Sequence, residues 1–260
     1  MHTKTNPIGL FDSGIGGTSI WKEIHALLPH EDTIYLADSK NAPYGQKSKE
    51  EIIELSFKNT RHLLSRGAKI IVVACNTATT NAIKELRAAF DVPFIGIEPA
   101  IKPAAISTQT GSIGILATKG TLTSELFAQK VSELKDVNII EQVGYNLVAL
   151  IEDGKLNSPE IKELLVTYLK PMIDANIDYL VLGCSHYPYL VPQIKEILPK
   201  GVHIIDSGEA VARQTRSILH KHNLLNETPK AAESLFYANN SPAVLQSIIG
   251  PEYTAEHLDF

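Results

Sequence analysis

The chain has 260 residues, of which 44% are hydrophobic and 20% charged, and its formal net charge is −5. This length suits one large or two small globular domains, and the mildly acidic balance excludes the basic surface typical of nucleic-acid-binding proteins. Cys75 and Cys184 are the only cysteines, too few for a disulfide framework. Because no secretory signal and no apolar run of membrane-spanning length is visible, we expect a cytoplasmic protein with reduced thiols and no membrane partner.

Short apolar runs alternate with amphipathic stretches along the chain. The apolar runs predict strands over residues 8–11, 33–37, 69–74, 113–117, 178–183 and 202–205. Apolar residues at helical spacing predict helices over residues 48–66, 79–89, 121–134, 158–170, 190–198 and 208–221. Since near-continuous apolar strands are those buried on both faces, this order predicts an α/β fold with a largely parallel sheet.

A faint internal repeat indicates two similar halves. Three segments recur in the same order at nearly the same offset: the run that begins at Ile8 recurs at Ile113, the strand that ends at Cys75 recurs at Cys184, and the stretch from Val92 to Ala100 recurs from residue 202 to 210. Any two βα units look somewhat alike, but the shared order and offset favour a true repeat.

Each cysteine lies at the carboxyl end of a predicted strand, where parallel sheets place their ligands. Cys75 is followed by Asn76 and Thr77, and Cys184 by Ser185 and His186. Backbone N–H groups at a helix start lower the pKa of a thiol and can also hold a carboxylate. Two facing halves would therefore present one thiol each to a shared cleft, and we interpret both thiols as functional.

Three interpretations of the thiol pair compete. A disulfide is disfavoured by the expected compartment. A catalytic zinc site of Cys75, Cys184 and His186 has suitable ligand types, but no motif supplies a remote ligand. In the third interpretation, one thiolate takes a proton from one face of a carbon and the other thiol delivers a proton to the opposite face.

Further polar residues lie on the expected ligand side of the sheet. Asp12 opens a glycine-rich turn, Asp12-Ser13-Gly14-Ile15-Gly16-Gly17, whose spacing is neither that of a dinucleotide fold nor that of a P-loop. Its carboxylate can orient a thiol or accept a proton. Residues 41–45 form a turn-rich loop after the second strand, Glu152 lies at a predicted helix end, and His186 is a candidate proton partner of Cys184.

Together these residues resemble the glutamate racemase family of the aspartate/glutamate racemase superfamily. The matching motifs run in family order across nearly the whole chain: Asp12-Ser13-Gly14-x-Gly16-Gly17, Pro43-Tyr44-Gly45, Cys75-Asn76-Thr77-Ala78, Gly96-x-Glu98-Pro99, Gly120-Thr121 and Gly183-Cys184-x-His186-Tyr187-Pro188.

The resemblance implies two pseudo-symmetric three-layer α/β domains with the active site in the cleft between them. The first domain would comprise residues 1–97 and the returning segment 207–260, and the second residues 98–206. Glutamate would bind in the cleft and be interconverted between its L and D forms without pyridoxal phosphate, metal or another cofactor, supplying D-glutamate for peptidoglycan. A homodimer is expected.

The resemblance also implies the roles of individual residues. Cys75 would deprotonate D-glutamate with help from Asp12, and Cys184 would deprotonate L-glutamate with help from Glu152 and His186. The residues expected to contact the substrate are Asp12, Ser13, Pro43, Tyr44, Gly45, Cys75, Asn76, Thr77, Thr118, Thr121, Cys184, Ser185 and His186. Uncharged donors at helix starts are suited to a small amino acid with two carboxylates.

Two departures from the family pattern and three alternative functions stay open. Ser185 replaces the usual Thr, which retains the hydroxyl, and Gly144-Tyr145 replaces Cys-Pro before the helix that leads to Glu152. The alternatives are a racemase for aspartate or another amino acid, a non-catalytic amino-acid-binding domain, and a zinc hydrolase.

Overall fold

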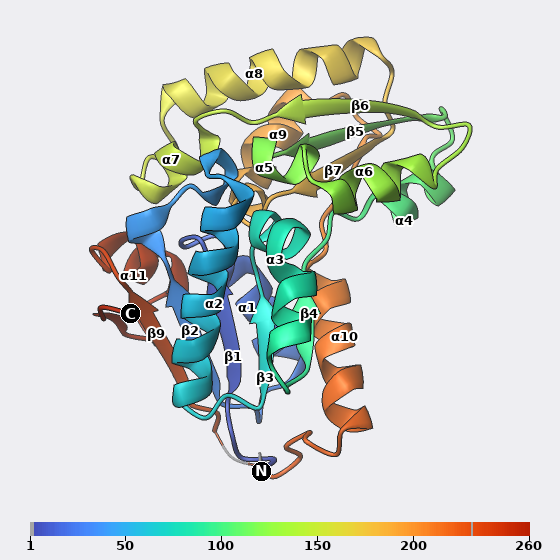
Figure 1. Ribbon diagram of the computed structural model, residues 1–260. Coiled ribbons are helices and arrows are strands. Elements are labelled where there is room, and N and C mark those ends of the chain that lie inside the picture. Colours follow the sequence, from blue (N-terminus) through green and yellow to red (C-terminus); the bar gives the residue numbers. More distant parts are fainter. Residues whose placement is uncertain (1–2, 230) are drawn as a thin grey trace.

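The computed structural model describes residues 3–229 and 231–260, which form two parallel β-sheets flanked by helices (Figure 1). In this part of the chain the first sheet has the strand order β10-β9-β2-β1-β3-β4, with Ile8–Asp12 (β1), Thr33–Ala37 (β2), Ile70–Val73 (β3), Phe94–Gly96 (β4), Ser234–Ala238 (β9) and Ala255–His257 (β10). The second has the order β6-β5-β7-β8, with Ser112–Ala117 (β5), Asn138–Val143 (β6), Tyr179–Gly183 (β7) and His203–Ile205 (β8). The predicted α/β class with parallel sheets is confirmed.

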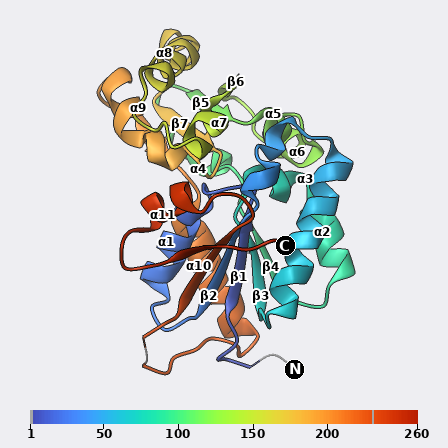
Figure 2. The same ribbon diagram turned by 90° about the vertical axis from the view of Figure 1, so that its left-hand side faces the viewer.

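Helices cover both faces of the first sheet. Figure 2 shows α2 and α3 on one face and α1 and α10 on the other. The longer helices are Thr18–Leu27 (α1), Lys49–Ser65 (α2), Asn76–Ala89 (α3), Glu125–Ser132 (α6), Pro159–Asp174 (α8) and Gly208–Lys221 (α10). The shorter ones are Ile101–Ser107 (α4), Lys119–Leu122 (α5), Leu147–Glu152 (α7), Val191–Ile197 (α9) and Ala243–Ile249 (α11), with 3₁₀ turns at Ser39–Asn41 (η1), Tyr44–Gln46 (η2) and Tyr187–Leu190 (η3).

The extent of burial explains why some strands could be predicted from the sequence and others could not. All residues of β1 and β3 are buried, because these strands lie in the interior of the sheet with helices on both faces. The strands that were not predicted, β4, β6, β9 and β10, lie at or next to a sheet edge. Strand β6 has no buried residue and carries Glu141 and Gln142, so its sequence lacks a continuous apolar run.

Helix capping sets two boundaries that differ from the prediction. Helix α3 begins at Asn76, earlier than the predicted residue 79, because the Cys75 sulfur accepts a hydrogen bond from the N–H of Ala78 and caps the helix. The predicted helix over residues 121–134 is two helices, since the Ser124 hydroxyl accepts from the N–H of Phe127 and starts α6.

The two sheets repeat one arrangement. The order β2-β1-β3-β4 in the first sheet matches β6-β5-β7-β8 in the second, so the internal repeat of the sequence corresponds to a repeated topology. After the second sheet the chain returns, and β9 pairs with β2 of the first (Figure 1). This return supports the domain boundaries that we propose, residues 1–97 with 207–260 and residues 98–206. None of the helices described is long and apolar enough to cross a membrane.

Candidate active site

The carboxyl ends of the strands in both sheets face a common cavity. Strands β1 and β3 lead into the segments that carry Ser13 and Cys75, and β5 and β7 lead into Thr118 and Cys184. The cavity spans about 240 Å³, including space open to solvent. It is lined by Ser13, Pro43, Tyr44, Gly45, Cys75, Asn76, Thr77, Thr118, Val148, Cys184, Ser185 and His186. Residues that are distant in the sequence and were predicted to contact one substrate therefore surround one space.

Three predicted residues lie behind this lining. Asp12 and Thr121 are fully buried next to it, and Glu152 lines a separate cavity on the other side of Pro43. Val148 lines the central cavity but was not predicted. It lies one helical turn before Glu152 on α7, and the spacing would have indicated it had the short helix been recognised.

Cys75 shares its surroundings with Asp12. The thiol lies 3.8 Å from the Ser13 hydroxyl and 3.4 Å from the N–H of Ala78. The Asp12 carboxylate accepts hydrogen bonds from the N–H of Gly17 at 2.9 Å and from the Ser185 hydroxyl at 3.2 Å. The last bond crosses from the second half of the chain to the first.

The pKa of the Cys75 thiol is raised well above its usual value, first by burial and then by the Asp12 charge. The N–H of Ala78 opposes this shift but does not overcome it. The helix start therefore lowers the pKa of Cys75 as expected, but burial and the Asp12 charge outweigh it. Burial also raises the pKa of Asp12, against the opposing influence of the His186 charge.

Cys184 has a different partner, His186. The imidazole Nδ1 lies 3.8 Å from the Cys184 sulfur, and Nε2 lies 2.5 Å from Oε1 of Glu152. The same carboxylate accepts from the N–H of Ile15 at 2.7 Å and from the Ser39 hydroxyl at 2.9 Å. Glu152 therefore orients the histidine and also ties the second half to two loops of the first.

The contacts of the His186 imidazole favour its protonated form. Burial alone would lower its pKa, but hydrogen bonds to Cys184 and Glu152 raise the pKa well above the usual value. An imidazole between a thiol and a carboxylate can take up the proton of the thiol as it becomes an imidazolium, and can return that proton later.

Two glycines of the first turn permit this close approach. A Cβ at Gly14 would overlap the Glu152 carboxylate, and a Cβ at Gly16 would overlap the His186 ring. The glycine-rich turn thus serves to admit side chains of the second half, rather than to cradle a phosphate.

Asn76 presents an unpaired amide to the cavity. Its side chain is buried, yet neither Oδ1 nor Nδ2 has a hydrogen-bond partner. A buried amide without partners is costly, so its presence in the cavity wall indicates a polar ligand that pairs with it.

Three threonine hydroxyls join the two halves beside the cavity. Thr77 Oγ1 lies 2.7 Å from Thr118 Oγ1, and Thr121 Oγ1 lies within 3.3 Å of both. Thr77 and Thr118 line the cavity, whereas Thr121 lies behind them and fixes their orientation.

The loop that carries Pro43 and Gly45 is anchored by a hydrogen bond of Tyr44. The Tyr44 hydroxyl donates to the buried carboxylate of Asp38, which also accepts from the Asn239 side chain of the returning C-terminal segment. The Tyr44 hydroxyl thus anchors this loop, and Tyr44 also lines the cavity.

Comparison with known proteins places the chain in a family. The family model described as Asp/Glu/Hydantoin racemase matches residues 13–215. The chain belongs to this racemase family. A glutamate racemase of Ectopseudomonas mendocina is 44% identical over 97% of the chain and 98% of its own length.

Solved racemase structures share the fold. The glutamate racemase of Escherichia coli in complex with L-glutamate has a TM-score of 0.85 at 34% identity and covers 97% of this chain and 98% of its own. The glutamate racemase of Francisella tularensis in complex with D-glutamate has a TM-score of 0.84 at 30% identity and covers 98% and 97%.

The two departures from the racemase pattern are accommodated. Ser185 retains the hydroxyl that donates to Asp12. Gly144 packs against Tyr187, whose hydroxyl donates to its carbonyl at 3.2 Å, and a Cβ at this position would overlap that hydroxyl. A cysteine at position 144 would require Tyr187 to move.

The other interpretations of the thiols lack support in the geometry. Both cysteines are free thiols. Among the described residues, no group of three or more His, Cys, Asp or Glu side chains is arranged to hold a metal ion.

Proposed function

We propose that the protein interconverts L- and D-glutamate by a two-base mechanism in which Cys75 and Cys184 act on opposite faces of the α-carbon. The observation that carries the proposal is that the two thiols, one from each half, line a single cavity. The relatives named above, among them enzymes in complex with L- and with D-glutamate, support glutamate as the substrate.

In the direction from L to D, the Cys184 thiolate takes the α-proton of L-glutamate. Cys75 then delivers its thiol proton to the opposite face, which yields D-glutamate. The cycle ends with a thiol at Cys184 and a thiolate at Cys75, and the reverse reaction starts from this state.

Each thiol exchanges its proton with the partner beside it. Asp12 accepts the proton of Cys75 when this residue must act as a base, and the buried, proton-binding character of both groups suits that exchange. His186, oriented by Glu152, does the same for Cys184.

The substrate is held by uncharged donors. We assign Asn76 to the α-carboxylate because its buried amide has no other partner. The hydroxyls of Ser13, Thr77 and Thr118 line the cavity and supply further donors, whereas the Ser185 hydroxyl already donates to Asp12. Fixed donors at the α-carboxylate also stabilise the negative charge that develops when the α-proton leaves.

The wider role follows from the same proposal. The thiols perform the chemistry without a cofactor, and the product D-glutamate enters peptidoglycan synthesis. We further propose a cytoplasmic homodimer.

The test uses each glutamate enantiomer in deuterated water without added cofactor, for the wild type, Cys75→Ser and Cys184→Ser. The wild type is expected to form the opposite enantiomer with deuterium at its α-carbon. Each serine variant is expected to lose activity by at least about 10²–10⁴-fold, because a hydroxyl is a far weaker acid and base at this position.

The controls separate chemistry from folding and from the alternatives. Serine is nearly the same size as cysteine, so the unfolding temperature of both variants should stay close to that of the wild type. The same assay with L- and D-aspartate tests the aspartate alternative. Racemisation of glutamate at the wild-type rate by either variant would refute the two-base proposal.

A further inference from the structure

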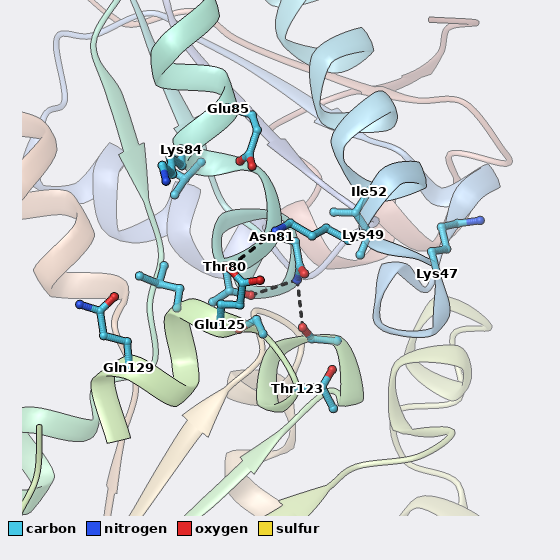
Figure 3. A pocket seen from close by; sticks show the side chains of 14 residues that line it. Lys47, Lys49, Ile52, Thr80, Asn81, Lys84, Glu85, Thr123, Glu125 and Gln129 are labelled. Atoms are coloured by element: carbon cyan, nitrogen blue, oxygen red, sulfur yellow. Dashed lines mark hydrogen bonds and ion pairs between the residues drawn. The ribbon is translucent and has the colours of Figure 1, made fainter. Parts of the chain in front are cut away.

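A second pocket lies where α3 of the first half meets α5 and α6 of the second. It encloses about 1020 Å³, and Lys49, Thr80, Asn81, Gly120, Glu125 and Gln129 belong to its lining (Figure 3). Asn81 lies between the two halves, and its side chain contacts the carbonyl of Gly120 and that of Thr77, a member of the threonine cluster of the active site (Figure 3). The pocket gives solvent access to this junction.

The Asn81 amide bridges two backbone carbonyls. Its Nδ2 donates to the carbonyl of Thr77 at 2.9 Å and to the carbonyl of Gly120 at 2.9 Å. The first bond lies within α3, but the second crosses to α5. Both hydrogens of the amide nitrogen are therefore used, one on each half of the molecule.

The segments joined by this amide are in close contact. A Cβ at Gly120 would lie 2.8 Å from the Thr77 methyl group and 3.2 Å from the Cα of Gly45, and a Cβ at Gly45 would lie 2.8 Å from the Cβ of Thr118. The segments that carry Gly45, Thr77 and Thr118 thus pack against one another with no room for an additional atom. A hydrogen bond at this position fixes how closely the halves approach.

We propose that Asn81 is a positioning residue that holds the two halves together around the bound substrate. Asn81 does not line the active-site cavity, so it acts through Thr77 and through the helix start that carries Thr118. The inference rests on the proposed function and deepens it, because it names a residue that stabilises the closed, substrate-binding state.

This role has a specific kinetic signature. Residues of both halves line the active-site cavity, so the substrate-binding state is the one in which the halves are together. If the closed state becomes less populated, the apparent affinity falls by the same factor, whereas the chemistry inside the closed complex is unchanged. Loss of the Asn81 bridge should therefore raise KM and leave kcat nearly constant.

The experiment compares Asn81→Ala, Asn81→Asp and the control Gln129→Ala. Gln129 lines the same pocket, and its side chain makes no hydrogen bond to the first half in the described structure. For Asn81→Ala we expect KM to rise about five- to tenfold for both enantiomers, with kcat within about twofold. Asn81→Asp should raise KM further, because a carboxylate would face two carbonyl oxygens.

Two further readouts exclude a merely structural effect. The unfolding temperature of Asn81→Ala should change by less than about 2 °C, since alanine is favourable in a helix. The primary deuterium isotope effects on kcat should equal those of the wild type. Gln129→Ala should match the wild type in every respect.

The outcomes separate the two proposals. A wild type that does not racemise glutamate overturns the proposed function. A racemising wild type whose Asn81→Ala variant keeps its KM within twofold, or loses kcat while KM stays constant, overturns the role of Asn81.

Discussion

The surroundings of Cys75 and of Cys184 differ although both thiols follow equivalent strands of a repeated topology. Cys75 lies beside Asp12, a fully buried carboxylate. Cys184 lies beside a histidine whose other nitrogen contacts Glu152, and the side chain of Glu152 is 12% exposed. The repeat has preserved the positions of the thiols but not the charge of their partners.

This difference has consequences for where protons reside. Burial and the Asp12 charge raise the pKa of Cys75 and so favour its thiol form, whereas hydrogen bonds to Cys184 and Glu152 raise the pKa of His186 and favour its cationic form. In the proposed reaction from L- to D-glutamate, Cys75 is the acid, and its raised pKa suits that role. Asp12 is fully buried, whereas Glu152 borders the separate cavity beside Pro43, which spans about 660 Å³ including space open to solvent.

Isotope effects, rather than kcat/KM, can distinguish a defect at Cys75 from a defect at Cys184. L- and D-glutamate have equal free energies, so kcat/KM must be the same in both directions for every variant. A change on one side instead appears in the primary deuterium isotope effects, because it decides which of the two proton transfers limits the rate.

The largest expected effect is that of Asp12→Asn. An amide cannot accept the Cys75 proton, so we expect kcat/KM to fall by about 10²–10⁴-fold in both directions. The transfer at Cys75 should then limit the rate. The isotope effect should increase with α-deuterated D-glutamate and decrease with α-deuterated L-glutamate.

The Asp12→Asn variant needs a check of its fold because Asp12 accepts from Gly17 and Ser185. The asparagine oxygen can retain one of these bonds, and the circular dichroism spectrum should match that of the wild type. Equal isotope effects with both enantiomers in a folded variant would show that Asp12 does not serve Cys75 alone.

Glu152→Gln should lower kcat/KM less than Asp12→Asn does. Its isotope effects should change in the opposite sense for the two enantiomers. A hydrogen bond to a charged group contributes about 1.5–3 kcal/mol, so we expect a loss of about ten- to hundredfold in kcat/KM. Glu152 acts through His186, and the transfer at Cys184 should become limiting. The isotope effect should now increase with α-deuterated L-glutamate, and an increase with the D enantiomer instead would contradict the pairing.

Much of this site could be predicted from the sequence. Apolar runs located β1, β3, β5 and β7, and the polar residues that follow them therefore had to meet at the carboxyl edges of parallel sheets. The equivalence of Cys75 and Cys184 came from the internal repeat. The position of His186 beside Cys184 indicated a proton partner, whereas the role of Glu152 came from family resemblance alone.

Other features depend on contacts that no local pattern encodes. The edge strand β6 is polar, so its sequence resembles a loop. Val148 belongs to a helix of six residues, too short for a periodic signal. The raised pKa of Cys75 requires the Asp12 charge and complete burial, both of which arise from tertiary packing. Asn81 shows its role only when its distance to Gly120 is known.

The smallest expected effect is on the pH dependence of stability, which tests whether His186 contributes to the fold as a cation. The folded pKa of His186 is raised above its usual value. Its contribution to the free energy of unfolding is therefore fully present below pH about 6.5, the unfolded value, and is lost as pH rises through the higher folded pKa. The pKa of Asp12 is also raised, but from 3.8, so the stability linked to it is fully present only below that pH and is lost as pH rises through its folded pKa.

Thermal unfolding of the wild type and Glu152→Gln across pH isolates the contribution of His186, because glutamine removes a hydrogen bond that raises the pKa of His186. We expect the wild type to be more stable by a few degrees at pH 6, since about 1 kcal/mol corresponds to roughly 2–4 °C in a protein of this size. The difference should shrink as the solution becomes alkaline. A difference that grows with pH would mean that His186 is not stabilised as a cation, and the contrast between the two thiol sites would then rest on Asp12 alone.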